Sequence, residues 1–430
     1  MNPTRSVAVA GCGPAGLACA LLLSRAGARV TLFERFETPR PVGSGLMIQP
    51  TGLAVLARLG LAEALIARSS RIDRLYGETA NTRRVTLDVR YRDLDPALYG
   101  LGVHRSVLFD LLHEAARSDG LEIVGGRTVT AAPADPDGRR RLRFADGEET
   151  APFDLIVDAL GARSPLARTA GRTLDYGALW ATLQRPAGDA FDPAALEQRY
   201  LAASVMAGVL PIGRHAEPGR PEHETVAFFW SLRLDRLDAW REAGLAAWKW
   251  EVLSVWPAVA PLLDQISDPE QLVVARYAHR RERTPVEPGL ARVGDSWHSA
   301  SPQLGQGANM ALLDAFALAR ALETEPDLST ALERYRRSRS GHVRLYQAVS
   351  ALFTPAYQSD SRVLPWLRDW LVGPLIRVPP APALQAALVA GAIGAPLRSL
   401  GLPPALGRSA APTPIAAPAE PPARRAASRR

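Results

Sequence analysis

A chain of 430 residues is long enough for two or three domains, or for one large cofactor-binding fold with insertions. Its 47% hydrophobic and 22% charged residues are typical of a globular protein, and having only two cysteines, Cys12 and Cys19, argues against a disulfide framework and a metal cluster. The net charge of +7 does not indicate nucleic-acid binding, because five arginines and one acid after Gly407 supply more than half of it.

The N-terminal segment has the order strand, glycine-rich turn, helix, strand and acid. An apolar strand over 7–10 runs into GCGPAG (11–16), a helix follows, and a second strand over 30–33 ends at Glu34. A G-x-G-x-x-G turn with an acid about twenty residues further on is the dinucleotide-binding fingerprint. The segment therefore predicts a Rossmann-like unit that binds NAD or FAD. No apolar leader precedes it, so we expect a cytoplasmic location.

The three glycines of this turn have separate roles. Gly11 permits the tight turn, Gly13 lets backbone N–H groups reach a pyrophosphate, and Gly16 lets the helix pack closely on the strand. Glu34 is placed to hydrogen-bond a ribose hydroxyl. A glycine-rich turn without a ligand is the weaker interpretation, because strand, helix and acid are all present.

Two later segments, 71–91 and 172–275, contain strands with alternating apolar residues such as Val226 and Phe228. Alternation with a period of two is typical of strands that bury one face. We expect both segments to form one antiparallel sheet. Within the second, residues 234–256 predict a tryptophan-rich helix that packs on this sheet.

A second glycine-rich loop lies between a short strand and a helix near residue 300. The strand ends in one acid, a proline stiffens the loop, and two glycines stand where the helix begins. In chain order these residues are Gly294, Asp295, Pro302, Gly305 and Gly307. An acid at the carboxyl end of such a strand is where an α/β sheet receives a polyol. The glycines would let a large polar ligand approach backbone N–H groups before a helix predicted over 308–320.

The C-terminal part changes character. Residues 356–406 predict short apolar helices interrupted by prolines, and we expect them to cap the sheet region. Docking onto the protein is the favoured interpretation, but Trp366 and Arg377 beside apolar stretches are also compatible with contact with a membrane surface. Residues 407–430, rich in Ala, Pro and Arg, predict a disordered tail.

These motifs together resemble the single-component FAD-dependent aromatic hydroxylases, the group with the fold of p-hydroxybenzoate hydroxylase. The resemblance runs from about residue 5 to 355. It rests on the N-terminal turn with Glu34-Arg35, on GSGLMIQPTGLAVLARLGL (43–61), VHRSVLFDLL (103–112), FDLIVDALGARSPLAR (153–168) and, above all, GDSWHSASPQLGQGANMALLDA (294–315).

The resemblance implies an α/β fold with a discontinuous Rossmann-like FAD-binding domain, an inserted antiparallel-sheet substrate domain and a helical C-terminus. We expect the FAD-binding domain in three pieces, 1–72, 100–172 and 275–355. The substrate domain would consist of 73–99 and 173–274.

The resemblance also implies how FAD is held without a covalent bond. Asp295 would bind the ribityl chain, Arg105 would lie against the ribityl-phosphate side, and Arg35 would lie near the adenine. Pro302, the residue assigned to the catalytic site, would border the pocket where oxygen meets the flavin and would fix its loop. His298 is given no role, and no metal is expected. The expected cofactor-binding residues are Gly11, Gly13, Pro14, Ala15, Gly16, Glu34, Arg35, Gly45, Arg105, Asp295, Gly305, Gly307 and Asn309.

One motif departs from the family pattern. Where the family usually has Gly-Ala-Asp-Gly, this chain has Asp158-Ala159-Leu160-Gly161. The usual acid lies near the nicotinamide cofactor, so Leu160 affects how NADH or NADPH is recognised. Asp158 either replaces that acid or caps the turn after its strand. The capping role is the favoured interpretation, because strand-end acids often satisfy local backbone donors.

The expected activity follows from the resemblance. NADPH or NADH would reduce FAD, O₂ would form a C4a-hydroperoxyflavin, and this would hydroxylate or epoxidise an aromatic or other electron-rich small molecule. The alternative is a flavin-dependent reductase, saturase or halogenase that acts on a lipophilic substrate. A flavin-binding protein without enzymatic activity has the least support, because no binding module is appended. The sequence leaves the substrate and the oligomeric state open.

Overall fold

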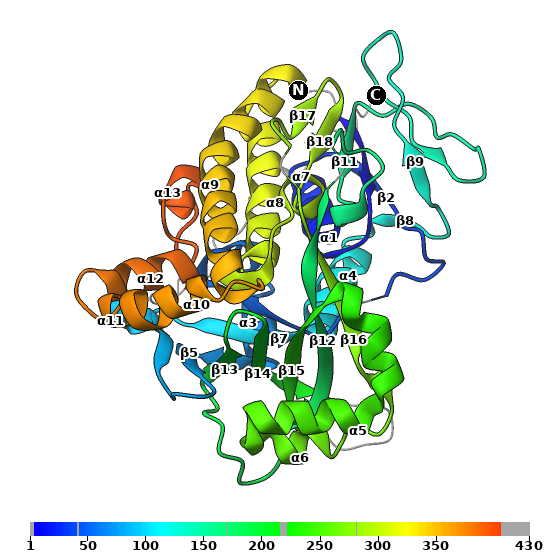
Figure 1. Ribbon diagram of the computed structural model, residues 1–430. Coiled ribbons are helices and arrows are strands. Elements are labelled where there is room, and N and C mark those ends of the chain that lie inside the picture. The colour runs from blue at the N-terminus through cyan, green and yellow to red at the C-terminus, as the bar shows by residue number, and fades with distance from the viewer. Residues whose placement is uncertain (1–3, 41–42, 170, 216–221, 281, 406–430) are drawn as a thin grey trace, which may run out of the picture.

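The computed structural model describes residues 4–40, 43–169, 171–215, 222–280 and 282–405. It confirms the expected fold class, with a mostly parallel sheet, an antiparallel sheet and a helical C-terminal region (Figure 1). The tail expected over 407–430 lies outside the described residues.

A six-stranded sheet carries the N-terminal motif. Its order is β17-β18-β11-β1-β2-β8, and its neighbours are parallel except for β17 and β18. The strands are β1 (Ser6–Ala10), β2 (Arg29–Phe33), β8 (Glu122–Val124), β11 (Leu155–Asp158), β17 (Val286–Glu287) and β18 (Leu290–Arg292). Val7 and Val9 pack under helices, whereas Ala8 and Ala10 pack under the arm formed by β9 (Val129–Ala131) and β10 (Arg143–Phe144). Because both faces are covered, the central strands are continuously apolar.

Helices α1 (Pro14–Arg25), α4 (Arg105–Ser118), α8 (Gly307–Thr324) and α9 (Leu328–Tyr357) form the helical layer on this sheet. Helix α1 contacts both α4 and α8, and α8 contacts α9. The helix expected over 308–320 begins one residue earlier, at Gly307, and runs on to Thr324. Helix α9 is capped by Asp327, whose carboxylate accepts from Thr330 N at 2.8 Å.

Two smaller units complete this part of the molecule. The antiparallel sheet β3-β7-β4 leads into helices α2 and α3, and the β9–β10 arm forms a separate pair. Their bounds are β3 (Gly45–Ile48), β4 (Ser70–Ile72), β7 (Gly100–His104), α2 (Pro50–Arg58), α3 (Ala62–Ala67), β9 (Val129–Ala131) and β10 (Arg143–Phe144).

The expected antiparallel sheet has seven strands in the order β16-β12-β15-β14-β13-β5-β6, of which only the pair β13 and β5 is parallel. The strands are β5 (Arg74–Thr79), β6 (Val85–Arg90), β12 (Arg172–Gln184), β13 (Ala195–Leu201), β14 (Val205–His215), β15 (His223–Arg233) and β16 (Val273–His279). Strand β16 begins at Val273, so the domain boundary expected at residue 275 falls inside a strand.

Alternation along β15 separates the two faces of this sheet. Val226, Phe228 and Trp230 pack against helices α5 (Leu237–Val255) and α6 (Ala260–Leu263), which cover the outer face (Figure 1). Ala227 and Phe229 point to the opposite face. The helix expected over 234–256 is a short 3-10 turn followed by α5, which is kinked where Gly244 has a φ of 80°.

The C-terminal region packs on the edge of the antiparallel sheet and on the helices α2 and α9. It contains α10 (Val363–Leu367), the π-helix η7 (Arg368–Val372), α11 (Gly373–Leu375), α12 (Ala381–Val389) and α13 (Pro396–Leu400). Helices α11 and α12 contact β6, and α13 contacts α9 and α2. These helices form the orange and red flank of Figure 1.

Candidate functional site

The first glycine turn joins β1 to α1. A Cβ on Gly11, whose φ is +104°, would lie 2.6 Å from Ala159 O, and one on Gly16 would lie 1.9 Å from Gly11 O. A Cβ on Gly13 would meet nothing within 4 Å. The outer glycines are therefore needed for packing, while Gly13 borders open space. Pro14 and Ala15 begin α1, which has no side-chain cap, so its first N–H groups can receive an anion.

Glu34 links this turn to the end of β2. Its carboxylate accepts from Cys12 N at 2.9 Å and from Phe36 N at 3.2 Å. The Arg35 guanidinium instead lies over the Phe36 ring, 4.6 Å from its centroid. Burial raises the pKa of the Cys12 thiol to about 12, and Glu34 adds to this effect, so the thiol stays protonated.

The second glycine loop begins at the end of β18. Gly294 has φ 61° and ψ −137°, and a Cβ there would lie 3.4 Å from the Ala15 Cβ and 3.0 Å from that of Ala311. Asp295, the first residue of α7 (Asp295–His298), is exposed, whereas Ser296 is buried. Because β1, β11 and β18 are parallel neighbours, both glycine turns lie at one edge of the sheet.

The loop continues through a 3-10 turn, η6 (Pro302–Leu304), to the start of α8. Gly305 is left-handed, with φ 61° and ψ 24°, and Pro302 and Gly307 are exposed. Helix α8 also lacks a side-chain cap. Several buried polar atoms in this loop have no hydrogen-bond partner among the described residues. They are Ser299 Oγ, Ser301 Oγ, Gln303 Nε2 and Gln306 Oε1. Unpaired buried polar atoms are unfavourable, so this cluster fits a loop that receives a polar ligand.

Asn309 is fully buried in the first turn of α8. Its Oδ1 accepts from Gln49 N at 2.7 Å, while Nδ2 donates to Met47 O at 3.1 Å and to Gly305 O at 3.0 Å. Both amide donors are used within the protein. The side chain expected to bind the cofactor therefore fixes Gly305 against the β3–α2 turn.

Arg105 and Gly45 lie where the two sheet regions meet. A Cβ on Gly45 would lie 2.7 Å from the Ala227 Cβ of β15, so this glycine permits close packing of β3 on the antiparallel sheet. Arg105 begins α4, and its guanidinium lies beside Gly43, 3.1 Å from a Cβ built there. Burial raises the pKa of Tyr277 to about 12, and the charge of Arg105 opposes this effect.

A buried ionic cluster, missed from the sequence, holds the second loop. The carboxylate of Asp314 on α8 accepts from Gly294 N at 2.9 Å and Arg339 Nε at 2.8 Å, and lies 2.5 Å from His298 Nε2. Burial opposes ionisation, but His298 and Arg339 lower the pKa of Asp314 below its usual value. His298, to which no role was assigned, thus anchors this loop. The one sequence signal was a lone acid in the apolar run of α8.

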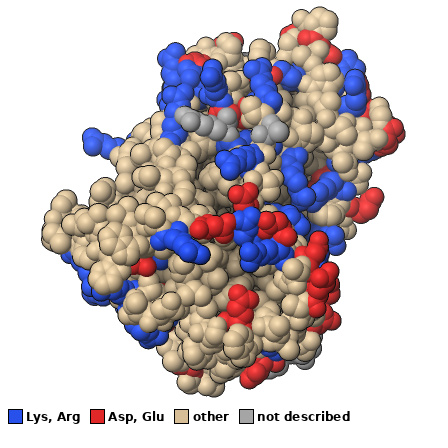
Figure 2. All heavy atoms as spheres, viewed as in Figure 1, with Lys and Arg blue, Asp and Glu red and all other residues tan. Residues whose placement is uncertain are grey.

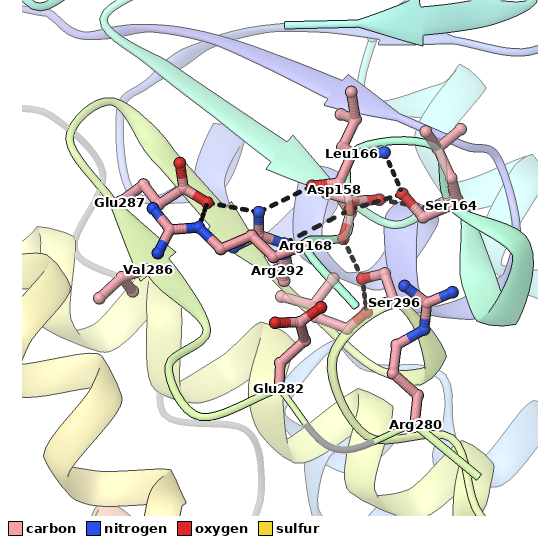
Figure 3. A network of polar contacts seen from close by, with 12 residues as sticks. Asp158, Ser164, Leu166, Arg168, Arg280, Glu282, Val286, Glu287, Arg292 and Ser296 are labelled. Carbon is pink, nitrogen blue, oxygen red and sulfur yellow. Dashed lines mark hydrogen bonds and ion pairs between the residues drawn. The ribbon is translucent and has the colours of Figure 1, made fainter. Parts of the chain in front are cut away.

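Asp158 at the end of β11 is also buried (Figure 3). Its carboxylate accepts from Leu160 N at 3.1 Å and from Ser164 Oγ at 2.7 Å, and burial raises its pKa. The Asp158 carbonyl accepts from Ser296 Oγ at 2.6 Å. This geometry caps the turn after β11 and ties it to α7.

An arginine network extends from this turn (Figure 3). Arg292 Nε lies 4.0 Å from Asp158 Oδ2, and Arg292 Nη2 contacts Glu287 at 2.5 Å. Glu287 also pairs with Arg168 at 2.8 Å. Asp158 therefore lies in a dense network of structural contacts. The apolar side chain of Leu160 has no hydrogen-bonding group and takes no part in this network.

An aromatic pair on the antiparallel sheet, Trp180 and Phe229, forms what we call the aromatic wall. Phe229 belongs to an apolar cluster with Met47, and Trp180 packs against this cluster. Met47 lies beside the second loop, because a Cβ built on Gly305 would be 3.7 Å from the Met47 Cβ. The Trp180 and Phe229 ring centroids are 4.7 Å apart, and Trp180 Nε1 donates to Tyr277 Oη at 3.0 Å.

A cavity of about 370 Å³ opens between β12, β16 and the end of α9. Tyr176, His279 and Gln358 are among its lining residues. Tyr176 lies on the same face of β12 as Trp180, because strand side chains alternate between faces. The two glycine turns are suited to a dinucleotide, and the cavity beside Tyr176 offers space for a small molecule.

Comparisons with known proteins agree with this geometry. Residues 4–184 match the family model described as "FAD binding domain". The chain is 28% identical to aurachin C monooxygenase/isomerase of Stigmatella aurantiaca over 386 residues, which cover 86% of this chain and 94% of that protein. It is 29% identical to 6-methylpretetramide 4-monooxygenase of Streptomyces rimosus, with 83% and 82% covered. The crystal structure of Klebsiella pneumoniae HpxO complexed with FAD and uric acid shares the fold, with a TM-score of 0.75 at 18% identity over 91% of this chain and 98% of that one.

Proposed function

We propose that the chain is an FAD-dependent monooxygenase of the aromatic hydroxylase family, and that it uses NADPH or NADH and O₂ to hydroxylate or epoxidise an aromatic or other electron-rich small molecule. The observation that carries the proposal is the 294–309 loop. It combines an exposed acid, a rigid proline and an uncapped helix N-terminus, and Met47 connects it to the cluster that contains Phe229.

The residues of the two glycine turns would bind FAD. The first turn of α1, bordered by Gly13, would receive the pyrophosphate, and Glu34 would receive the adenosine ribose through lone pairs not used by Cys12 and Phe36. Asp295 would bind the ribityl hydroxyls, and Arg105 would lie on the phosphate side. When bound, the flavin accepts electrons from the nicotinamide coenzyme and, once reduced, activates oxygen for transfer to the substrate.

The chain itself would orient the ring and exclude water. The N-terminus of α8 directs backbone N–H groups and the positive end of the helix dipole at the loop, which favours negative charge there. Pro302 fixes the backbone at the point where oxygen would enter. Asn309 and Asp314 hold the two ends of the loop in place.

Tyr277 is the residue we propose for orienting the substrate. Its oxygen accepts from Trp180 Nε1, which leaves its own O–H available to donate. With a pKa raised to about 12, it stays protonated throughout the neutral range. The aromatic faces of Trp180 and Phe229 would bind the substrate ring beside this hydroxyl.

Recognition of the coenzyme would not use an acid at the usual position. Leu160 has no acceptor, and the Asp158 carboxylate is occupied by turn donors. We therefore propose that the coenzyme binds at the surface formed by the glycine turns and neighbouring arginines. The assay below compares NADH with NADPH.

The test is the rate of NADH and NADPH oxidation by the purified flavoprotein with phenols, quinols and polyketide-like aromatics, followed by product analysis under labelled oxygen gas. Incorporation of one labelled oxygen atom into a product is the expected result. A product formed equally well without oxygen would replace this proposal with a flavin-dependent reductase or saturase. Coenzyme oxidation that never yields an oxygenated or a halogenated product would refute both oxygenation and halogenation of these substrates.

A further inference from the structure

Helices α10 to α12 carry an apolar surface that no described residue covers. Six of its large side chains are 51–60% exposed, and they define what we call the C-terminal apolar surface. They are Trp366, Trp370, Leu371, Leu375, Val378 and Leu384. Exposed apolar residues are normally scattered, so a contiguous group on one helical segment indicates an interaction surface.

The inner side of the same segment is firmly attached to the protein. Ala386 and Val389 of α12 are buried, and Tyr346 Oη donates to Leu388 O at 2.9 Å. Gln306, between the two glycines of the second loop, donates from Nε2 to Val389 O. Arg368 of η7 donates to Ala356 O at 2.8 Å and to Ala202 O at 3.1 Å. The exposed side chains therefore belong to a docked segment and not to a frayed end.

Positive charge borders this surface. The Arg84 guanidinium lies 3.4 Å from the centroid of the Trp370 ring, Arg377 reaches Val85 O at 3.4 Å, and Arg362 is exposed next to α10. The only acid between residues 362 and 400 is Asp369, which pairs with Arg368 at 2.7 Å. Figure 2 shows the tan surface of this flank with blue Lys and Arg atoms along its lower margin.

We propose that the C-terminal apolar surface docks on an anionic phospholipid membrane. Trp366 and Trp370 would enter the level of the headgroups, and the bordering arginines would pair with phosphates. The helices would lie in the membrane plane, since among the described residues no helix is long and apolar enough to cross a bilayer.

A second copy of the chain fits the surface less well. Two-fold symmetry would place the same arginine-bordered patch on both sides, and the single acid between residues 362 and 400, Asp369, already pairs with Arg368. A membrane with anionic headgroups offers the opposite charge instead. The inference does not depend on which substrate the enzyme oxidises.

The experiment is co-sedimentation of the full-length flavoprotein with two kinds of vesicle, one of phosphatidylcholine and one of equimolar phosphatidylcholine and phosphatidylglycerol. We expect strong binding to the anionic vesicles and weak binding to the neutral ones. Trp366→Ser combined with Trp370→Ser should lower the affinity about tenfold or more. Arg84→Gln with Arg377→Gln should remove most of the preference for phosphatidylglycerol. The matched control is Trp250→Ser, which changes a 75% exposed tryptophan on α5 and should bind as the parent does.

Flavin content and circular dichroism establish that each variant is folded. No binding to anionic vesicles would overturn the proposal. Binding that the two tryptophan substitutions leave unchanged would also overturn it, because it would then come from the arginine-rich sequence after residue 407. An oligomer in light scattering that these substitutions dissociate, without vesicle binding, would identify a second copy as the occupant.

Discussion

Replacing Asp314 with asparagine tests whether the buried ionic cluster holds the second glycine loop, for which we propose a role in binding FAD. The substitution keeps the side-chain volume, so no cavity contributes. It removes the negative charge beside Arg339, which is fully buried and pairs with Asp314 at 2.8 Å. Leaving a buried charge without its partner costs about 3–5 kcal/mol. We expect the urea midpoint of unfolding, followed by tryptophan fluorescence, to fall accordingly, and FAD to be lost on dialysis because Gly294 loses a charged acceptor.

A matched control uses an exposed ion pair. Asp238 and Arg241 are 3.1 Å apart, with side chains 88% and 56% exposed, so Asp238→Asn should cost less than about 1 kcal/mol. Adding Arg339→Gln to Asp314→Asn should recover part of the loss, because no buried cation then remains. If Asp314→Asn and Asp238→Asn were equally stable, the reasoning about the buried charge would be refuted. A strongly destabilised Asp314→Asn protein that retained its FAD would refute the link to the loop.

Four further predictions concern single residues. Asp295→Ala should weaken FAD retention about tenfold or more, by loss of a charged hydrogen bond of roughly 1.5–3 kcal/mol, and unchanged flavin content after dialysis would remove Asp295 from the site. Asp158→Ala should lower thermal stability and flavin content together, whereas slowed flavin reduction in a stable, fully flavinated variant would contradict the capping role. Burial and the charge of Arg339 lower the pKa of His342 to about 3. Below about pH 6.5 the imidazole is therefore protonated in the unfolded chain but stays neutral in the folded protein, which favours unfolding. This group should remove about 3 kcal/mol of stability between about pH 7 and pH 4, and His342→Asn should flatten that part of the profile. Tyr277→Phe should raise KM for the substrate with little change in FAD content, and an unchanged KM would exclude it from substrate binding.

The sequence determined the features that depend on neighbours along the chain. A glycine with positive φ, such as Gly11 or Gly305, is required by its own turn, and the spacing of GCGPAG before a helix predicts that turn without further information. Alternation in β15 similarly predicts which side chains face the same way. For this reason the fold class and the approximate positions of the two glycine-rich turns could be predicted from the residues.

Only the tertiary structure decided how distant residues share their polar groups. From the sequence, Asn309 and Asp158 could each have faced a ligand. In the fold, Asn309 bonds to Gln49, Met47 and Gly305. Asp158 accepts from the turn donors Leu160 N and Ser164 Oγ. The contacts of Asn309 and those joining Asp314 to Arg339 cross many residues of chain, so no local pattern encodes them.

Tertiary structure also decides whether the tryptophans of the two tryptophan-containing segments are buried or exposed. Trp248 on α5 is buried under the antiparallel sheet, whereas Trp366 and Trp370 on the C-terminal helices are exposed beside arginines. As sequences, both segments contain tryptophan, apolar residues and charge, and this pattern alone does not distinguish a helix that packs inward from one whose apolar face stays exposed. Exposure is set by which surfaces the rest of the chain can cover, and only the assembled fold supplies that information.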